Sequence, residues 1–242
     1  MIKTPSSAPP TGKALRSDGA EARNRLLDAA LGLFAEKGFA KTSTREIALA
    51  AQVNIASISY YFGDKAGLYR AVFSDPRCNP NVSPESVADA SLSLREALHR
   101  VMGSFLEPLK QGQLIQHCMK LHFREMLEPT GVWQEEIDCN ITPAHGALVE
   151  VLCRHLTLET PNDDIHRLAF SISGLGVMLH IGSDVVTAVR PQLLASHAAL
   201  DHYCECLVTY AMDMVEGEAR RRANPTPHPS SVPSRPNRKK PT

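Results

Sequence analysis

The sequence lacks any run of apolar residues that approaches the length of a membrane span, so no membrane-embedded segment is expected. The N-terminal stretch MIKTPSSAPPTGK has no apolar core and does not resemble a secretory signal. Six cysteines without such a signal predict reduced thiols in a cytoplasmic protein. Alternation of apolar and polar residues is also missing, so no β-strand is expected.

Motifs that carry catalysis are missing as well. We find no GxSxG, no P-loop and no GxGxxG in a strand–helix context, and the ten histidines have no matched nucleophile. Neither CxxC nor HExxH occurs. Cys118 and His122 share a helix face, but two ligands do not complete a metal site. Cys204 and Cys206, two residues apart, point in different directions on a helix. An enzyme and a metal sensor are therefore disfavoured, and no cofactor or metal is expected.

The lack of net charge hides a segregation along the chain. Residues 1–70 contain ten Lys or Arg and six Asp or Glu, whereas residues 71–219 contain nine and twenty. Residues 220–242 contain seven basic residues and no acidic one. A basic head suits phosphate binding, and DNA would repel an acidic body. The body is therefore expected to point away from a duplex.

Composition and periodicity divide the chain into four parts. We expect a flexible arm over 1–20, a helical head over 21–73, a larger helical domain over 85–222, and a disordered, basic, Pro-rich tail over 223–242. In the head, the first helix is expected over 20–37 and ends at Gly38. Apolar periodicity predicts the further helices of the larger domain at 86–111, 113–127, 133–157, 162–186 and 196–222.

Residues 38–65 predict a helix-turn-helix, whose second helix enters the DNA major groove. Ser43 is an N-cap candidate with Glu46 three residues on, the pattern of a capping box. Asn54 is a second N-cap candidate and opens the short helix Ile55 to Phe62. A further helix is expected to start near Asp64.

This stretch resembles the DNA-binding domain of TetR-family transcriptional regulators over residues 22–73. The elements that carry the resemblance are Gly38-Phe39, Thr44-Arg45-Glu46-Ile47-Ala48, Val53, Tyr60-Tyr61-Phe62 and Lys65. The run from Asn54 to Lys65 is similar to the CecR-like branch of that family. One departure is Gln52, where the family usually has Gly; a turn residue with positive φ favours Gly.

The resemblance implies which side chains face DNA: Thr44, Arg45, Ala56, Ser57, Ser59, Tyr60, Tyr61 and Lys65. Their chemistry agrees, because a hydroxyl at a helix N-terminus and basic side chains suit phosphate, and small residues let a helix sit deep in a groove. Structural alternatives remain for several of them. Tyr60 is equally suited to packing and to phosphate, whereas Tyr61 favours DNA. Arg45 could pair with Glu46 or Glu36, and Ile55 could meet a thymine methyl or pack at the cap.

The resemblance further implies a small-molecule pocket and a dimer. Pocket candidates are polar or aromatic residues in apolar helices, each of which could instead only pack: Phe105, His117, His122, Phe123, Arg124, Trp133 and His180. His180 stands out, since an imidazole in so apolar a helix needs a partner. The last two long helices are expected to form the dimer interface, with Ile172, Leu175 and Leu179 along the seam.

The predicted fold is therefore all-α, with an N-terminal three-helix helix-turn-helix domain and a C-terminal helical domain for ligand binding and dimerisation. The predicted function is a sequence-specific transcriptional regulator, a repressor that binds a palindromic double-stranded DNA operator as a homodimer and is released by a small-molecule effector. The alternative is a ligand-independent DNA-binding regulator or adaptor.

Overall fold

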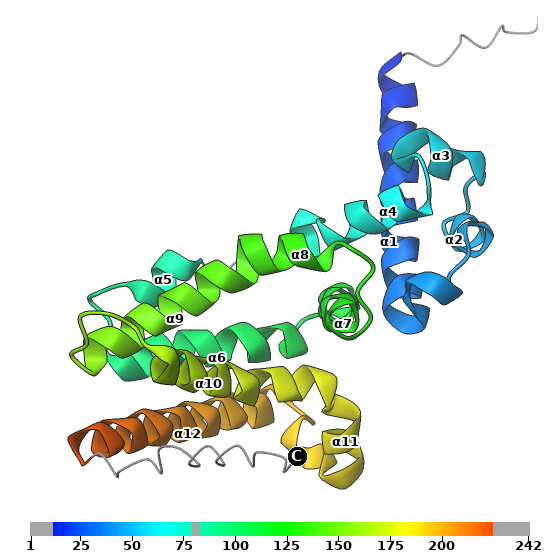
Figure 1. Ribbon diagram of the computed structural model, residues 1–242. Coiled ribbons are helices and arrows are strands. Elements are labelled where there is room, and N and C mark those ends of the chain that lie inside the picture. Colours follow the sequence, from blue (N-terminus) through cyan, green and yellow to red (C-terminus); the bar gives the residue numbers. More distant parts are fainter. Residues whose placement is uncertain (1–11, 79–82, 225–242) are drawn as a thin grey trace, which may run out of the picture.

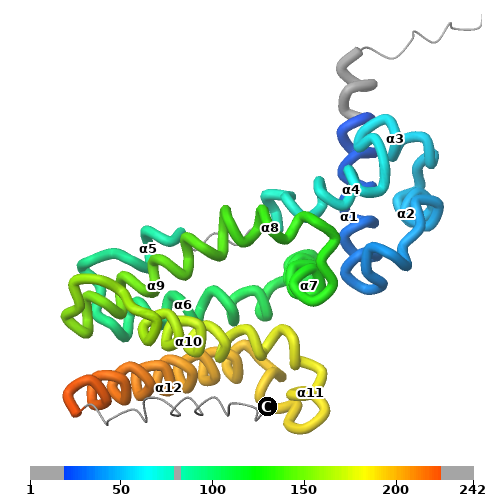
Figure 2. The backbone as a smooth tube through the Cα atoms, in the orientation of Figure 1, coloured from blue at the N-terminus to red at the C-terminus, as the bar shows by residue number. Residues whose placement is uncertain are grey.

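A computed structural model describes residues 12–78 and 83–224, with side chains described from Gly19 onward (Figure 1). Every regular element in these ranges is a helix, so the all-α prediction is confirmed. The N-terminal elements form a head and the remaining helices form a larger body (Figures 1 and 2). The predictions for residues 1–11 and 225–242 lie outside the described residues.

The head contains four helices and a short 3-10 turn: α1 (Gly12–Lys41), α2 (Thr44–Ala50), α3 (Ala56–Phe62), α4 (Lys65–Phe73) and η1 (Pro76–Cys78). The first helix begins at Gly12, so part of the expected flexible arm is helical. Gly38 interrupts α1 with a φ of 79° and a ψ of 167°, which places the predicted break at the predicted glycine. Lys41 ends the short helical extension that follows.

The caps of the head helices follow the sequence only in part. Asn54 was expected to cap a helix that starts at Ile55, but α3 begins at Ala56 and Ile55 is its N-cap, without a side-chain cap bond. Ser43 accepts a hydrogen bond from the Glu46 backbone N–H at 3.1 Å, as an N-cap should. The Glu46 carboxylate, however, pairs with the Lys37 ammonium group and does not bond back to Ser43, so only half of the capping box forms. A lysine at the end of α1 thus outcompetes a backbone N–H for the same carboxylate.

The body follows the predicted helices but divides three of them. Its elements are α5 (Pro84–Ala88), α6 (Leu94–Lys110), α7 (Gln113–Leu127), α8 (Trp133–Glu136), the π-helix η2 (Ile137–Ile141), α9 (Thr142–His155), α10 (Asp163–Ile181), α11 (Ser183–Val189), η3 (Pro191–Leu193) and α12 (His197–Ala223). The predicted helix 113–127 is confirmed. The π-helix precedes Pro143, which has no N–H to donate to the carbonyl four residues earlier. Helix α11 turns away from α10 by 71° after Gly182.

Two apolar cores lie under these helices. The body core joins α6, α9, α10 and α12. The head core joins α1 to α4, and α7 of the body contributes Cys118 and Leu121 to it. Helix α7 therefore belongs to both parts of the molecule, and Figure 1 shows it end-on between α1 and α6.

Two of the three residues expected at the dimer seam, Ile172 and Leu179, are a wrong prediction, whereas half-buried Leu175 stays a prediction. Ile172 and Leu179 are 0% and 1% exposed within the single chain, and Leu175 packs against the body core. A helix with wide apolar faces turns its most apolar face towards its own core, and periodicity alone does not say which face that is. The outward face of α10 carries Phe170, Met178 and Ile181.

The expectation of reduced thiols is also wrong for one pair. Cys78 of η1 and Cys118 of α7 form a disulfide with a Cα–Cα distance of 5.1 Å. Their separation of 40 residues matches no sequence motif, because only the packing of the head against α7 brings them together. Cys139, Cys153, Cys204 and Cys206 are free thiols.

None of the described helices is, on its own, both long enough and apolar enough to span a membrane; only the bent pair α10–α11 meets the criteria of length and composition together.

Candidate nucleic-acid interface and its link to the body

Helix α3 is held by a few buried side chains and presents the rest of its surface outward. It has seven residues, which is too short for stability in isolation. Ile58 is buried in the head core and Phe62 packs against that core, while Asn54 Oδ1 accepts a hydrogen bond from the Ala56 N–H at 2.9 Å. Figure 1 places α3 at the end of the molecule remote from α12. The anchoring leaves one face of α3 free for a partner.

The residues predicted to face DNA come from the start of α2, from α3 and from the start of α4. Arg45, Ala56, Ser59 and Tyr60 are exposed, and the half-buried ones are Thr44, Ser57, Tyr61 and Lys65. Within the described ranges, no ion pair engages Arg45, because Glu46 pairs with Lys37 and Glu36 with Lys120. The guanidinium of Arg45 is therefore available to a phosphate or a guanine edge.

The two neighbouring tyrosines differ in what they offer. Tyr60 is 82% exposed, whereas Tyr61 packs against the head core and its hydroxyl lies beside Gly19 of α1. Their ring centroids are 4.9 Å apart in an edge-to-face arrangement. Tyr60 thus offers more surface to a duplex, the reverse of the order expected from the sequence.

Lys65 lies at the first turn of α4, behind Asp64, whose carboxylate caps the helix at Gly67 N–H with a distance of 2.7 Å. Its ammonium nitrogen lies 4.4 Å from the centroid of the Phe39 ring. Such a cation–π contact holds the ammonium group in place. A phosphate approaching the N-terminus of α4 would meet a positioned cation.

Two apolar residues of the head are exposed, and only Leu49 was given no role by the sequence. Leu49 of α2 is 79% exposed and Ile55, before α3, is 48% exposed. Leu49 is out of phase with Ile47, Ala48 and Ala51, which fill the core, so helical periodicity contained the signal. The exposure of Ile55 leaves it free to meet a thymine methyl, one of its two expected roles.

The head is joined to the body along α7 by buried and covalent contacts. Glu125 is 1% exposed and its carboxylate accepts hydrogen bonds from the Tyr69 hydroxyl at 2.7 Å and from Thr130 N–H at 2.6 Å. Burial, and then the bond to Glu125, raise the pKa of Tyr69 well above its usual range. Tyr69 therefore stays protonated as the donor that ties α4 to α7.

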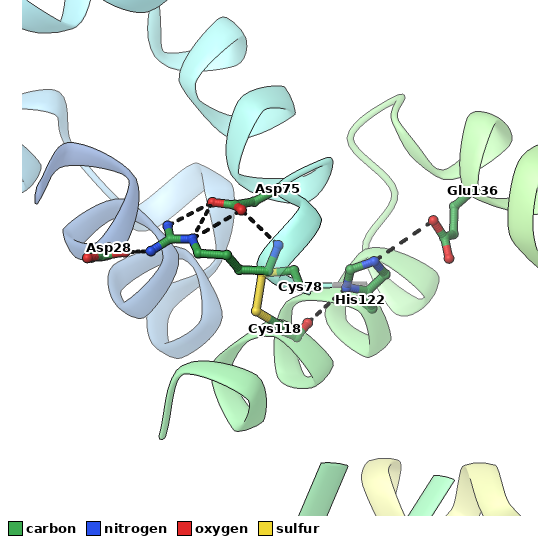
Figure 3. Close-up of a disulfide and its surroundings, with 7 residues drawn as sticks. Asp28, Asp75, Cys78, Cys118, His122 and Glu136 are labelled. Atoms are coloured by element: carbon green, nitrogen blue, oxygen red, sulfur yellow. Dashed lines mark hydrogen bonds and ion pairs between the residues drawn. A yellow bond between two sulfur atoms is a disulfide. The ribbon is translucent and has the colours of Figure 1, made fainter. Parts of the chain in front are cut away.

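Figure 3 shows the disulfide between Cys78 and Cys118, with Asp28, Asp75 and His122 around it. Arg77, next to Cys78, forms ion pairs with Asp28 of α1 at 2.8 Å and with Asp75 at 2.7 Å. One turn beyond Cys118, the His122 ring stacks on Phe73 with a centroid distance of 4.3 Å. The end of α4 is thereby fixed to both α1 and α7.

A cleft of about 540 Å³ lies on the far side of α7, bounded by α6, α10 and α11. Of the predicted ligand residues, Phe123, Arg124 and His180 line it. The His180 ring stacks on Phe123 at 4.7 Å, and its Nε2 lies 2.7 Å from the Phe105 carbonyl oxygen, so Phe105 lies directly behind the wall. Burial lowers the pKa of His180, which is neutral at pH 7.

The other predicted ligand residues lie elsewhere. His122 lines a second cleft, of about 390 Å³, between α4, α7 and η2. Trp133 packs against the head core. His117 lies within reach of Glu36, with 3.9 Å between His117 Nε2 and Glu36 Oε1. The structure therefore gathers four of the seven candidates around one cleft and separates the rest from it.

Two family models match this chain. Residues 26–72 match the model of bacterial regulatory proteins of the tetR family. Residues 94–215 match the C-terminal domain of the HTH-type transcriptional dual regulator CecR. The chain therefore belongs to the TetR family of bacterial regulatory proteins. Within that family its body is a CecR-type C-terminal domain, as the residues 54–65 had indicated.

Individual relatives agree with this assignment. The HTH-type transcriptional dual regulator CecR of Shigella flexneri is 31% identical over 150 residues, which are 57% of this chain and 66% of that protein. The probable HTH-type transcriptional regulator YttP of Bacillus subtilis (strain 168) is 47% identical over 53 residues, 22% of this chain and 26% of that protein. The chain thus spans just under two thirds of the first relative's length and about a quarter of the second's.

A solved structure shares the fold. NalD, the secondary repressor of the MexAB-OprM multidrug efflux pump in Pseudomonas aeruginosa, aligns with a TM-score of 0.54 at 20% identity, over 82% of this chain and 97% of that chain.

Proposed function

We propose that this protein is a sequence-specific DNA-binding transcriptional regulator that acts in the cytoplasm, has no enzymatic activity, and represses from a palindromic operator. The observation that carries the proposal is the exposed face of α3 within a TetR-type head. It is flanked by Arg45, which forms no ion pair with the described residues, and by Lys65, which is held over the Phe39 ring. A small helix face, two cations and free hydroxyls are what a major-groove reader needs.

A homodimer completes the proposal. One head reads a short half-site, and two heads about one turn of DNA apart match a palindrome. The dimer surface is proposed along the outward faces of α10 and α12, where Phe170, Met178 and Tyr210 are between 51% and 61% exposed. Such a row of exposed apolar side chains is unusual on a surface that meets only water.

A small-molecule effector is proposed to bind the cleft beside α7. Its volume lies within the range of small-molecule sites, and its wall combines aromatic rings with a few polar groups. A ligand-independent regulator is the second candidate. It is favoured only if ligands of the cleft leave operator affinity unchanged.

The DNA contacts are tested by alanine substitution. Lys65→Ala is expected to weaken binding to every sequence alike and to lower the slope of log affinity against log salt by about one unit. Arg45→Ala and Tyr60→Ala are expected to weaken binding as well. An operator is first found by footprinting. Gel-shift titrations of that operator at several salt concentrations then give the affinity and its slope against salt.

The matched control is Arg190→Ala, which removes an exposed cation of the body at the end of α11. It should leave both affinity and slope unchanged. Operator affinity that is unaltered in all three head variants would contradict the proposed interface.

A further inference from the structure

We propose that the cleft beside α7 binds an amphipathic organic anion, a carboxylate or sulfonate on an apolar body, and that this anion competes with the head for Lys120 and Arg124. The proposal rests on the proposed function, because it names the chemical class of the effector and the contact through which it acts. Both side chains line the cleft and both also bind the end of α1.

One face of helix α7 packs in the head core, and another face lines the cleft. Leu121 and Cys118 lie in the head core, whereas Met119 and Phe123 line the cleft. Lys120 and Arg124, one turn apart, lie on the boundary between these faces. Their charged groups are therefore within reach of either side.

The contacts of the two cations with α1 are specific. Lys120 Nζ lies 2.8 Å from Glu36 Oε1, and this hydrogen bond is the largest cause that lowers the pKa of Glu36. The Arg124 guanidinium donates to the carbonyl oxygens of Ala35 and Glu36, both at 3.3 Å. These carbonyls belong to the last turns before Gly38, where the helix dipole favours a cation.

The apolar body of such a ligand has a matching surface. Leu109, Phe123, Leu127, Leu179 and Ile181 line the cleft. The imidazole of His180, stacked within 13° of parallel on Phe123, adds a flat neutral wall. Aromatic and aliphatic side chains around a few charged groups are typical of sites for amphipathic ligands.

The acidic residues of the lining do not reverse the preference for an anion. Glu128 is at the rim, 69% exposed at its side chain, and is 3.5 Å from Arg124. The Asp184 carboxylate accepts a hydrogen bond from the Val185 N–H at 2.8 Å at the start of α11. A cation in the cleft would instead meet Lys120 and Arg124 on the α7 wall.

Replacement of the α1 contacts of Lys120 and Arg124 by a ligand would loosen the head from α7. The Lys120–Glu36 pair is about half exposed at both side chains, so replacing its carboxylate by that of a ligand costs little. When the ligand takes Lys120 and Arg124, the end of α1 loses its hydrogen bonds with these two side chains of α7. By thermodynamic linkage, a ligand that weakens the contacts between head and body binds less tightly while those contacts are formed.

A matched pair of fluorescent probes tests the ligand class on the full chain without DNA. The probe 8-anilinonaphthalene-1-sulfonate is an amphipathic anion, and N-phenyl-1-naphthylamine is the same ring system without the sulfonate. We expect the sulfonate to bind about tenfold more tightly or better, as a charge-assisted hydrogen bond contributes on that order. Equal affinity of the two probes would overturn the proposed ligand class.

Variants test the competition. Lys120→Met should weaken the sulfonate about tenfold and leave the neutral probe unchanged. Glu36→Gln, which leaves the cleft intact, should tighten the sulfonate about threefold by removing its competitor. Lys41→Met, an exposed cation further along α1, is the control and should change neither. An unchanged sulfonate affinity in Glu36→Gln would overturn the competition.

Operator DNA gives the last readout. The sulfonate should weaken operator binding by the wild-type protein and do so less in Glu36→Gln, where the contact that it breaks is already lost. Probe binding as predicted without any operator binding would contradict the proposed function alone. Operator binding without a preference for the anion would contradict this inference alone.

Discussion

Among the residues that the structure describes, two other than glycine have a left-handed backbone, Gln52 at φ 55° and Thr157 at φ 57°. Gln52 occupies the turn between α2 and α3, where Val53 N–H bonds to the Ala48 carbonyl oxygen at 3.0 Å. A side chain at such a φ is strained, and a β-branched one more so. The turn therefore keeps its geometry because α2 and α3 pack in the head core on both sides.

Gln52→Gly is expected to raise the free energy of unfolding by about 0.5–1 kcal/mol, as relief of strain exceeds the entropy lost by glycine. Thr157→Gly should raise the free energy of unfolding by at least the same amount. Ala50→Gly is the control. Ala50 is exposed and helical, so this substitution should lower the free energy of unfolding by about 1 kcal/mol. Urea unfolding of the three variants gives the values. If Gln52→Gly is less stable than the wild type, the Gln52 side chain stabilises the fold by more than its left-handed backbone costs.

At the scale of the element, the sequence predicted where helices lie better than it predicted which face of each helix is buried. Helix 113–127, the cap at Ser43 and the start of a helix near Asp64 were readable because each depends on neighbouring residues. The π-helix before Pro143 and the bend after Gly182 were missed, since a break inside an apolar pattern is set by tertiary packing. For the same reason, periodicity could not tell the core face of α10 from its outward face.

The outward face of α10 and α12 is where dimerisation can be tested. Phe170→Glu combined with Met178→Glu should give monomers, because both side chains are exposed and a buried carboxylate at a dimer seam is costly. Leu49→Glu is the control, since Leu49 is an apolar residue of the head that is even more exposed than Phe170 and Met178. Sedimentation velocity distinguishes the species. A dimer that persists in the double variant would place the seam elsewhere.

At the scale of the whole molecule, the sequence predicted the two-part helical architecture but not how the parts are joined. The residues proposed to contact DNA could be predicted because they lie within one short segment of the chain. The Cys78–Cys118 disulfide, the buried Tyr69–Glu125 bond and the cleft all combine residues that are distant in sequence. Only the packing of α7 against the head brings them together.

The disulfide is expected to stabilise the joined molecule. Closing a loop of 40 residues restricts the unfolded chain by about 4 kcal/mol in the loop-entropy model. Reduction should therefore lower the free energy of unfolding by about 2–4 kcal/mol. The control is the double variant Cys78→Ala/Cys118→Ala, which should be equally destabilised and insensitive to the reductant. Wild-type stability that does not respond to reduction would contradict the role of the bond.

The same bond changes the connectivity of the chain. Residues 78–118 form a closed covalent ring, which includes all of α5 and α6. One peptide cleavage inside this ring, for example after Arg95 or Arg100, leaves the two fragments linked through sulfur. The nicked protein would migrate as one band on a non-reducing gel and as two on a reducing gel. The head and the body would then separate only after two events, the cut and the reduction.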